Sequence, residues 1–417
     1  MPDHYVILHR WVDEYAQYEN YIDHHNSFVT YITTFHASRG VPPTASAVQI
    51  VEATDDFDEV LRAAGVLAQD FGAPTHVVAL YEDDTICGAR LREKYRCPGP
   101  KVDDLIRFRD KRIQADAMAR AGVRAPKYCS VESSDDALRF ADEIGYPIVV
   151  KPTRASSCKG IQIVAKPQDV RDLQLEDAYK YIAQEFIEFP VYHIDGLYSR
   201  GQLVRVGVNR YFNTCIGFQK GGYLGSLEVD DSPLRRAAVR FAEDVLRAIC
   251  LSDETIVFHL ELFVDHNAMP EEACTFLELA ARVGGGGIPF VWREIYNFDI
   301  MRMQFELSCG RSVESVPTAQ PSASAGWLLM QLPHERPCKI ESVTSLVGTE
   351  MGPYAESIPY RGQVVPLTDT FFEHVAGRFR FRGENHTELF EKMIATADAF
   401  RVEASPLVDS FVGGPAR

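Results

Sequence analysis

The 417 residues are 46% hydrophobic and 24% charged, which is ordinary for a globular enzyme of two or three subdomains. The net charge of −16 without a basic stripe argues against nucleic acid as a partner, and no apolar run reaches the roughly eighteen residues of a membrane span. Nine cysteines without a Cys-x-x-Cys pair indicate neither a zinc site nor a disulfide framework, and with no secretory start they favour reduced thiols in a cytoplasm.

Residues 1–100 alternate apolar strands with helical segments, which is the pattern of a small open α/β sheet. Tyr5–Leu8 and His76–Tyr81 are typical of buried parallel strands, and Asp56–Phe71 has the spacing of an amphipathic helix. Pro98-Gly99-Pro100 then marks a break. We therefore expect an N-terminal domain over residues 1–100 with an open parallel sheet.

Residues 101–188 predict a second unit of the α+β class. A helix over Ile106–Ala121 should end at Gly122. The further predicted elements are an edge strand after Val123–Tyr128, a helix over Ser133–Gly145, and strands over Pro147–Pro152, Ile161–Val164 and Tyr181–Ile187.

Residues 189–417 predict a third unit that is mostly strands. Besides the two glutamate-bearing strands described below, it should contain strands around His193–Asp195 and Leu203–Val208, a helix from Ser232 to about Cys250, a strand at Arg378–Phe381 and a helix over Thr387–Phe400. Residues 308–326 are rich in Ser, Pro and Ala and predict a surface excursion.

Two glutamates, Glu261 and Glu278, are the most informative feature of the chain, because each lies inside an apolar run that predicts a strand. If Val264 and Thr275 close an antiparallel hairpin, Glu261 lies directly opposite Glu278. Like charges in that position oppose strand pairing. A divalent cation between them removes the penalty, and Mg²⁺ takes such oxygen ligands. The alternative is two exposed glutamates on a solvated sheet face.

Other polar residues in apolar segments complete a set that suits a triphosphate with magnesium. Lys111 starts a helix, Lys151 ends a buried strand, and the small-residue loop Thr153–Gly160 follows. Arg282 precedes the glycine run Gly284–Gly287. The cations would neutralise phosphate charge, and the acids would hold the metal. A Walker phosphate loop, a kinase catalytic loop and a G-x-S-x-G elbow are all absent from the sequence, so a nucleotide needs another binding scheme.

That scheme resembles the ATP-grasp superfamily, and the resemblance spans most of residues 101–300. Within the superfamily, Glu278-Leu-Ala-Ala-Arg-Val-Gly-Gly285 is similar to the motif of bacterial L-amino-acid ligases of the bacilysin-synthetase kind. The resemblance implies the ATP-grasp fold, in which the N-terminal α/β domain is followed by two α+β subdomains that clamp ATP, here residues 101–188 and 189–417.

The resemblance also implies roles for individual residues. Lys111 and Lys151 would contact the α- and β-phosphates. Glu261 and Glu278 would ligate two Mg²⁺ ions, for which Mn²⁺ could substitute, and Arg282 would stabilise the acyl phosphate and the tetrahedral intermediate. The other implied contacts are Gly285 to substrate oxygen, Ser156, Ser157 and Gly160 in a lid over the phosphates, Gln184, Glu185, Phe186 and Ile187 at the adenine, and His193 at the ribose, where many members carry a glutamate that is Val191 here.

Glu82, at the carboxyl end of a predicted strand, and Gly286 are further candidates for substrate binding, although stabilising a helix dipole is the simpler account of Glu82. By resemblance the chain is an ADP-forming ligase that joins an amino acid, or another carboxylate, to an amine. The alternatives are an enzyme acting on bicarbonate or a small carboxylate, a kinase that phosphorylates a hydroxyl, and a nucleotide-binding regulator. The expected partners are small molecules, and a homodimer stays open.

Overall fold

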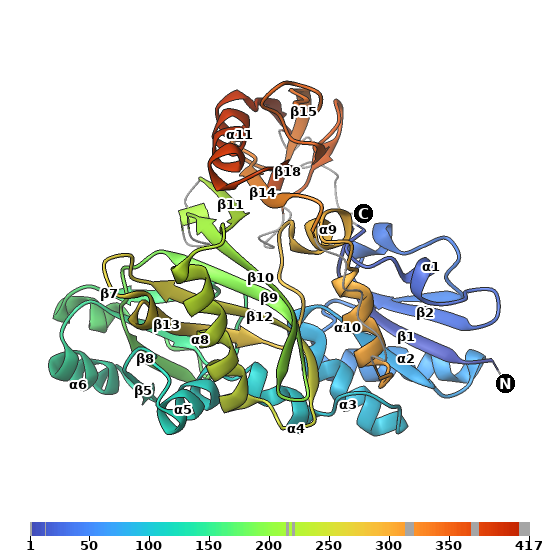
Figure 1. The fold of residues 1–417 in the computed structure, drawn as a ribbon. Coiled ribbons are helices and arrows are strands. Elements are labelled where there is room, and N and C mark those ends of the chain that lie inside the picture. The colour runs from blue at the N-terminus through green and yellow to red at the C-terminus, as the bar shows by residue number, and fades with distance from the viewer. Residues whose placement is uncertain are drawn as a thin grey trace, which may run out of the picture. The chain divides into compact units, whose positions relative to one another are not determined.

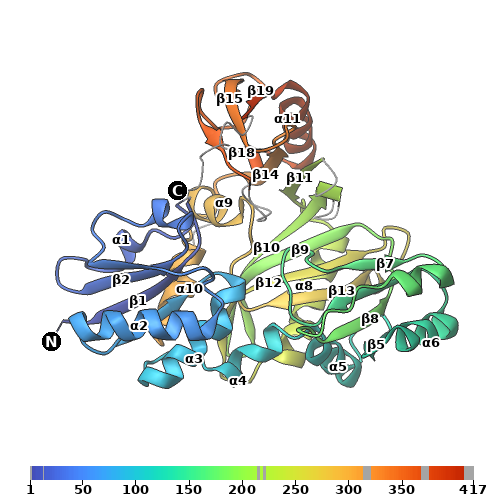
Figure 2. The same cartoon turned by 180° about the vertical axis from the view of Figure 1, so that it is seen from behind.

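The computed structural model describes residues 2–12, 14–213, 217–218, 222–312, 321–367 and 375–407 (Figures 1 and 2). The chain forms two compact units. The first contains Met1–Val208, Asp231–Gly284 and Phe298–Ala319, and the second contains Asn209–Asp230, Gly285–Asn297 and Gln320–Arg417. The boundaries predicted near residues 100 and 188 fall between sheets and stay a prediction.

The first unit begins with a parallel sheet in the order β3-β2-β1-β4. Its strands are β1 His4–His9, β2 Phe28–Thr33, β3 Ala47–Ile50 and β4 His76–Ala79. Helices α2 (Phe57–Phe71) and α3 (Thr85–Tyr95) bury one face, where Val6 and Leu8 pack against Val60. Helices α1 (Tyr18–Tyr21) and α10 (Ile300–Ser308) lie on the other face (Figure 2). There the ring of Phe305 lies 6.4 Å from the rings of Tyr5 and Tyr18. The predicted open α/β sheet is confirmed.

The middle of the first unit is an antiparallel sheet in the order β5-β8-β6-β7. Its strands are β5 Tyr128–Val131, β6 Ile148–Pro152, β7 Gln162–Val164 and β8 Tyr181–Glu185, and α6 Ser134–Ile144 packs on β5 and β8. Strand β8 ends two residues earlier than predicted. Short 3-10 helices also occur among the described residues: η1 Ala37–Gly40, η2 Glu82–Asp84, η3 Ile106–Phe108, η4 Pro167–Asp172 and η5 Pro270–Glu272.

The helix predicted from Ile106 was wrong at its start. Residues Val102–Leu105 form the short helix α4, and the long helix α5 covers Lys111–Ala121. Asp110 separates them because its backbone is extended and its carboxylate accepts hydrogen bonds from the N–H groups of Arg112 and Ile113, which makes it the N-cap. This cap places Lys111 at the first position of α5, as predicted.

The last sheet of the first unit has the order β13-β12-β9-β10 and carries helix α8 on β9 and β13. The bounds are β9 Val191–Ser199, β10 Gln202–Phe212, α8 Pro233–Ile249, β12 Thr255–Val264 and β13 Cys274–Ala280. In the hairpin, Val264 pairs with Cys274 rather than Thr275, so the predicted closure was wrong by one residue. A bulge after Glu261 absorbs that residue, and Glu261 does lie directly opposite Glu278.

Strand β10 continues into the second unit, where the strand order is β10-β11-β14-β18-β16. The bounds are β11 Tyr223–Glu228, α9 Ile288–Glu294, β14 Ser324–Gln331, β16 Ala355–Ser357, β18 Val375–Gly383 and α11 His386–Ala399, with a small sheet of β15 Cys338–Val343, β17 Val364–Val365 and β19 Val402–Pro406. Helix α11 packs on the larger sheet through Leu389 and Met393. Within the predicted 308–326 excursion, residues 313–320 lie outside the described residues, and its last residues belong to β14.

One parallel sheet with several antiparallel sheets confirms the predicted mixed α/β and α+β class. In the part of the chain that the structure describes, no helix has both the length and the apolar character needed to cross a membrane.

The N-cap of α2 offers a test of local stability. Asp56 accepts hydrogen bonds from the N–H groups of Asp58 and Glu59 at 2.9 and 3.0 Å. Asp56→Ala should lower the free energy of unfolding by about 1 kcal/mol, because two helix N–H groups lose their acceptor. The exposed Asp70→Ala at the other end of α2 is the matched control and should not destabilise the protein. Urea denaturation followed by circular dichroism measures both, and equal midpoints for the two variants would contradict the capping role.

Candidate functional site

The two glutamates of the hairpin share one place on the sheet with a lysine from another element. Glu261 and Glu278 are a directly opposed pair, and their side chains are 25% and 24% exposed. The Lys111 ammonium lies 2.8 Å from Oε1 of Glu278. The alternative of two glutamates on a solvated face is therefore wrong. The lysine supplies positive charge beside the opposed carboxylates. The two carboxylates are oxygen ligands of the kind that Mg²⁺ takes, so this donor set fits a cation.

A buried glutamine brings the lysine to the acids. The Gln114 side chain, one turn along α5 from Lys111, accepts from Leu279 N at 3.1 Å and donates to Leu279 O at 2.7 Å. Leu279 is the residue after Glu278, so this pair of bonds fixes the start of α5 beside the second glutamate. Lys111 also donates to the carbonyl oxygen of Ala155 at 2.8 Å.

Lys151, near the end of β6, is the second predicted phosphate ligand. Its side chain is buried, with 4% of the residue exposed. Burial, and then the positive charge of Lys111, lower the pKa of Lys151 to about 8. The side chain therefore stays mostly protonated at neutral pH, and a negatively charged partner would raise its pKa again.

The predicted lid loop, Thr153–Gly160, connects β6 to β7. The Ser156 hydroxyl donates to Oδ2 of Asp83 at 2.8 Å, so the loop is tied to the loop that follows β4. Ser157 and Cys158 have positive φ values of 53° and 60°, and Gly160 follows with 71°. A Cβ on Gly160 would lie 2.8 Å from Pro152 Cγ, which explains the glycine there.

The predicted adenine hinge lies at the end of β8. Gln184 is buried and pairs with Tyr128 and Val149 on the neighbouring strands. Glu185 ends the strand, and its carboxylate accepts from Lys127 N at 3.2 Å. Phe186 and Ile187 follow the strand and are half-buried, so their main-chain groups lie beyond the β-ladder.

Glu82 and Arg282 form a buried ion pair across 200 residues of sequence. Arg282 Nε donates to Glu82 Oε2 at 2.8 Å, and Arg109 binds the other oxygen, Oε1. Burial would raise the pKa of Glu82, but the two guanidinium groups lower it to about 2. Gln304 on α10 fixes this arrangement, since it accepts from Val283 N at 2.8 Å and donates to Leu80 O at 3.2 Å.

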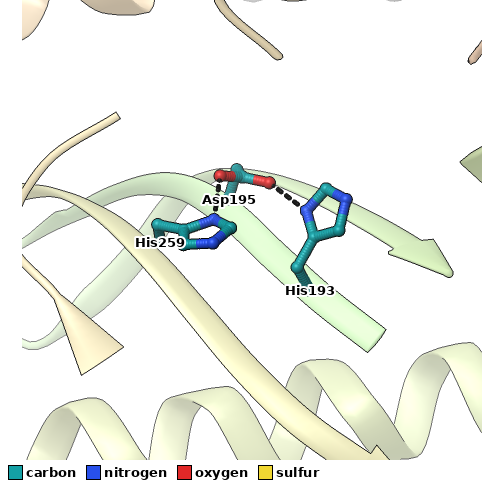
Figure 3. A group of neighbouring side chains, drawn as sticks. All are labelled: His193, Asp195 and His259. Carbon is teal, nitrogen blue, oxygen red and sulfur yellow. Dashed lines mark hydrogen bonds and ion pairs between the residues drawn. The ribbon is translucent and has the colours of Figure 1, made fainter. Parts of the chain in front are cut away.

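His193 does not lie free on its strand. Its Nδ1 is 2.5 Å from Oδ2 of Asp195, and Nδ1 of His259 is 2.8 Å from Oδ1 of the same carboxylate (Figure 3). All three residues are buried. Burial would lower the pKa of His259, but Asp195 raises it to about 9, and Nε2 of that ring lies 3.5 Å from Glu261.

Gly285 and Gly286 belong to the second unit. Gly286 has a φ of +63°, and a Cβ there would lie 2.6 Å from Cη2 of Trp327. A Cβ on Gly287 would lie 2.3 Å from the Trp327 Cβ. These two glycines are therefore required by the indole that packs on their backbone, which is a more specific reason than a flexible turn.

The structure adds residues that the sequence did not single out. They are Asp83 and Arg109 around Glu82, Asp195 and His259 beside Glu261, and the two glutamines that fix the elements, Gln114 and Gln304. The pattern His-x-Glu at 259–261 and His-x-Asp at 193–195 was available, because alternate residues of a strand share a face. The glutamines and Arg109 gave no signal, since their partners are distant in sequence.

Comparison with known proteins agrees with this geometry. Residues 110–188 match the family described as carbamoyl-phosphate synthase L chain, ATP binding domain. The L-arginine-specific L-amino acid ligase of Bacillus subtilis is 23% identical over 279 residues, which is 64% of this chain and 65% of that protein. Residues 110–188 are therefore similar to an ATP-binding domain, and the chain spans less than two thirds of the length of this relative.

Two solved structures share the fold of this chain over 97% of its length. The crystal structure of the L-amino acid ligase from Bacillus licheniformis covers 97% of this chain and 99% of its own, with a TM-score of 0.74 and 17% identity. The biotin carboxylase domain of the 2-oxoglutarate carboxylase from Hydrogenobacter thermophilus, in complex with MgADP, ADP and bicarbonate, covers 97% and 91%, with a TM-score of 0.68 and 15% identity.

The lowered pKa of Lys151 predicts how stability depends on pH. At a pH between the pKa of Lys151 in the folded protein, about 8, and its ordinary pKa of 10.5, the unfolded chain binds a proton that the folded protein does not. The destabilisation that burial of Lys151 causes therefore becomes smaller as the pH rises through this window. Relative to Lys151→Met, the free energy of unfolding of the natural protein should therefore gain roughly 1.4 kcal/mol per pH unit across this window. Urea denaturation of both proteins from pH 7 to pH 10 measures the difference, and a difference constant with pH would contradict the lowered pKa.

Proposed function

We propose that this protein is an ADP-forming ligase that joins the carboxylate of an amino acid to an amine through an acyl phosphate. The observation that carries the proposal is the opposed pair Glu261 and Glu278 with Lys111 bound to it. Two carboxylates with Lys111 in contact and the charge of Lys151 nearby are suited to a nucleotide triphosphate with its metal. The ATP-grasp domain and the similarity to amino-acid ligases support this choice.

Binding of Mg²⁺ and ATP is an exchange of partners at Glu278. The metal would be held by Glu261 and Glu278 and would offset the charge that develops on the transferred phosphate. Lys111 would then be released from Glu278 and would turn to the phosphates together with Lys151. The lid loop would close over them through Ser156, Ser157 and Gly160, and the main chain at Glu185–Ile187 would read the adenine.

The Glu82–Arg282 pair supports an amino acid as the carboxylate substrate. An amino acid is a zwitterion, so each of its charges complements one member of this ion pair. Its ammonium suits Glu82, and its carboxylate suits Arg282. Binding would then replace one buried salt bridge by two, without leaving a buried charge unpaired.

In the reaction, a carboxylate oxygen of the first substrate attacks the γ-phosphorus, the bond to the β-phosphate oxygen breaks, and ADP leaves. The amine of the second substrate attacks the acyl carbon, loses a proton, and displaces phosphate. Arg282 and the backbone N–H groups near Gly285 and Gly286 stabilise the oxyanion and the leaving phosphate. The closed lid loop excludes water, which would otherwise hydrolyse the acyl phosphate.

The second candidate is an enzyme that activates bicarbonate or another small carboxylate. The similarity to a carboxylase domain bound to bicarbonate favours it, because the same fold then acts on a substrate without an amino group. A kinase acting on a hydroxyl has no use for the Arg282 and glycine-run arrangement.

The free cysteines support a reducing compartment such as the cytoplasm.

The decisive experiment measures phosphate release from ATP in the presence of amino acids, singly and in pairs. For a ligase, phosphate release should require two amino acids, or an amino acid and another amine, and the product should contain both. Release that depends on bicarbonate alone would favour the second candidate. Equal release with no substrate added would contradict both.

The acid pair can be tested directly. Glu278→Gln keeps the shape of the side chain but removes a charged metal ligand, so turnover should fall by a factor of about 100 or more while the melting temperature changes little. The matched control is Glu271→Gln on the β12–β13 connection, which loses only an exposed ion pair to Arg240. Turnover within a few-fold of the natural protein in Glu278→Gln would contradict the assigned role.

A further inference from the structure

Two neighbouring strands place four ionisable side chains in a square on one face of the sheet. His193 and Asp195 are alternate residues of β9, and His259 and Glu261 are alternate residues of β12. In the antiparallel register, Asp195 pairs with His259, and His193 pairs with Glu261. Within the square, each carboxylate therefore has a histidine beside it both along its strand and across the β9–β12 ladder, while Glu261 also lies opposite Glu278 on the β12–β13 ladder.

Two hydrogen bonds and one ion pair link the members of this square. Asp195 is fully buried, and each of its two oxygens accepts from a different imidazole, at 2.5 Å from His193 and 2.8 Å from His259 (Figure 3). His259 uses Nδ1 for this bond, which turns its other nitrogen, Nε2, toward Oε1 of Glu261 at 3.5 Å. The order is thus Asp195, His259, Glu261, running from the buried interior toward the acid pair.

The same three residues, His193, Asp195 and His259, have ligand atoms within 4.8 Å of one another, a spacing that a metal ion could use. Both oxygens of Asp195, however, already accept a hydrogen bond from a ring nitrogen. Asp195 therefore has partners for both oxygens without an ion. The contacts lead from Asp195 through His259 to Glu261, so the effect of this group is exerted on Glu261.

We propose that Asp195 and His259 are positioning residues for the cation site. Asp195 fixes the ring orientation of His259, and His259 holds one oxygen of Glu261, so that the other oxygen faces the space shared with Glu278. Partners of this kind behind a ligand orient it and raise the affinity for the metal. The proposal rests on the metal site of the proposed function and adds two residues to it.

The test measures the affinity for ATP by calorimetry in EDTA and again in Mg²⁺, because the ratio of the two dissociation constants reports the metal site alone. His259→Leu should reduce the gain from Mg²⁺ by about ten- to a hundred-fold and leave the affinity in EDTA unchanged. His259→Gln should retain most of the gain, since its amide can donate to Glu261 from nearly the same position.

His4 gives a matched control outside the site. It is a buried strand histidine with both ring nitrogens bonded, to Gly72 O at 2.7 Å and to Thr30 Oγ1 at 2.9 Å. His4→Leu should cost stability as His259→Leu does, yet the ratio of ATP affinities should equal that of the natural protein. A merely structural role of His259 predicts the same unchanged ratio for both.

The outcomes separate this proposal from the one on which it rests. No gain from Mg²⁺ in the natural protein, or an unchanged gain in Glu278→Gln, would overturn the metal site and the positioning role together. A gain that Glu278→Gln loses and folded His259→Leu keeps would overturn the positioning role only. If the His259 variants do not fold, Asp195→Asn, which keeps the volume of the side chain, decides by the same ratio: a reduced gain supports the role and an unchanged gain overturns it.

Discussion

Two carboxylates that face each other across an antiparallel ladder are the constraint on which this site depends. Glu261 and Glu278 cannot lie there without positive charge nearby, because like charges in a directly opposed pair destabilise the strands that carry them. The fold supplies that charge from two sides, as Lys111 binds Glu278 and His259 approaches Glu261. These contacts hold helix α5, strand β12 and strand β13 in a mutual arrangement.

The same constraint governs the cations. Arg282 is paired with Glu82, and Lys111 with Glu278, so most buried charges of the ligand-free site already have a partner. In the proposed function, ligand binding would therefore exchange ion pairs, which avoids the large cost of an unpaired buried charge. Lys151 differs, since burial lowers its pKa instead.

The sequence predicted what depends on local pattern, and failed where distant partners decide. Periodicity located strands such as β1, β6 and β12 and helices α2, α6 and α8, and alternation within β12 and β13 identified the acid pair. It missed other elements, including strands β2, β3 and β14 and helices α3, α9 and α10. The helix predicted from Ile106 began late because the Asp110 cap overrides the apolar spacing before it. The opposition of Glu261 and Glu278 was predicted from a closure that is wrong by one residue, and a bulge, which leaves no signal in composition, restored it. The Glu82–Arg282 pair could not be predicted, because its members are 200 residues apart.

The glycine run after Arg282 is explained by packing within the second unit. The acids, the lysines, Arg282 and the lid loop all belong to the first unit, whereas Gly285–Gly287 and Trp327 belong to the second. Trp327 packs on the backbone of Gly286 and Gly287. A side chain at Gly286 or Gly287 would therefore displace the indole. No local pattern of the sequence predicts this contact, because Trp327 is distant in the sequence from the glycines that it requires.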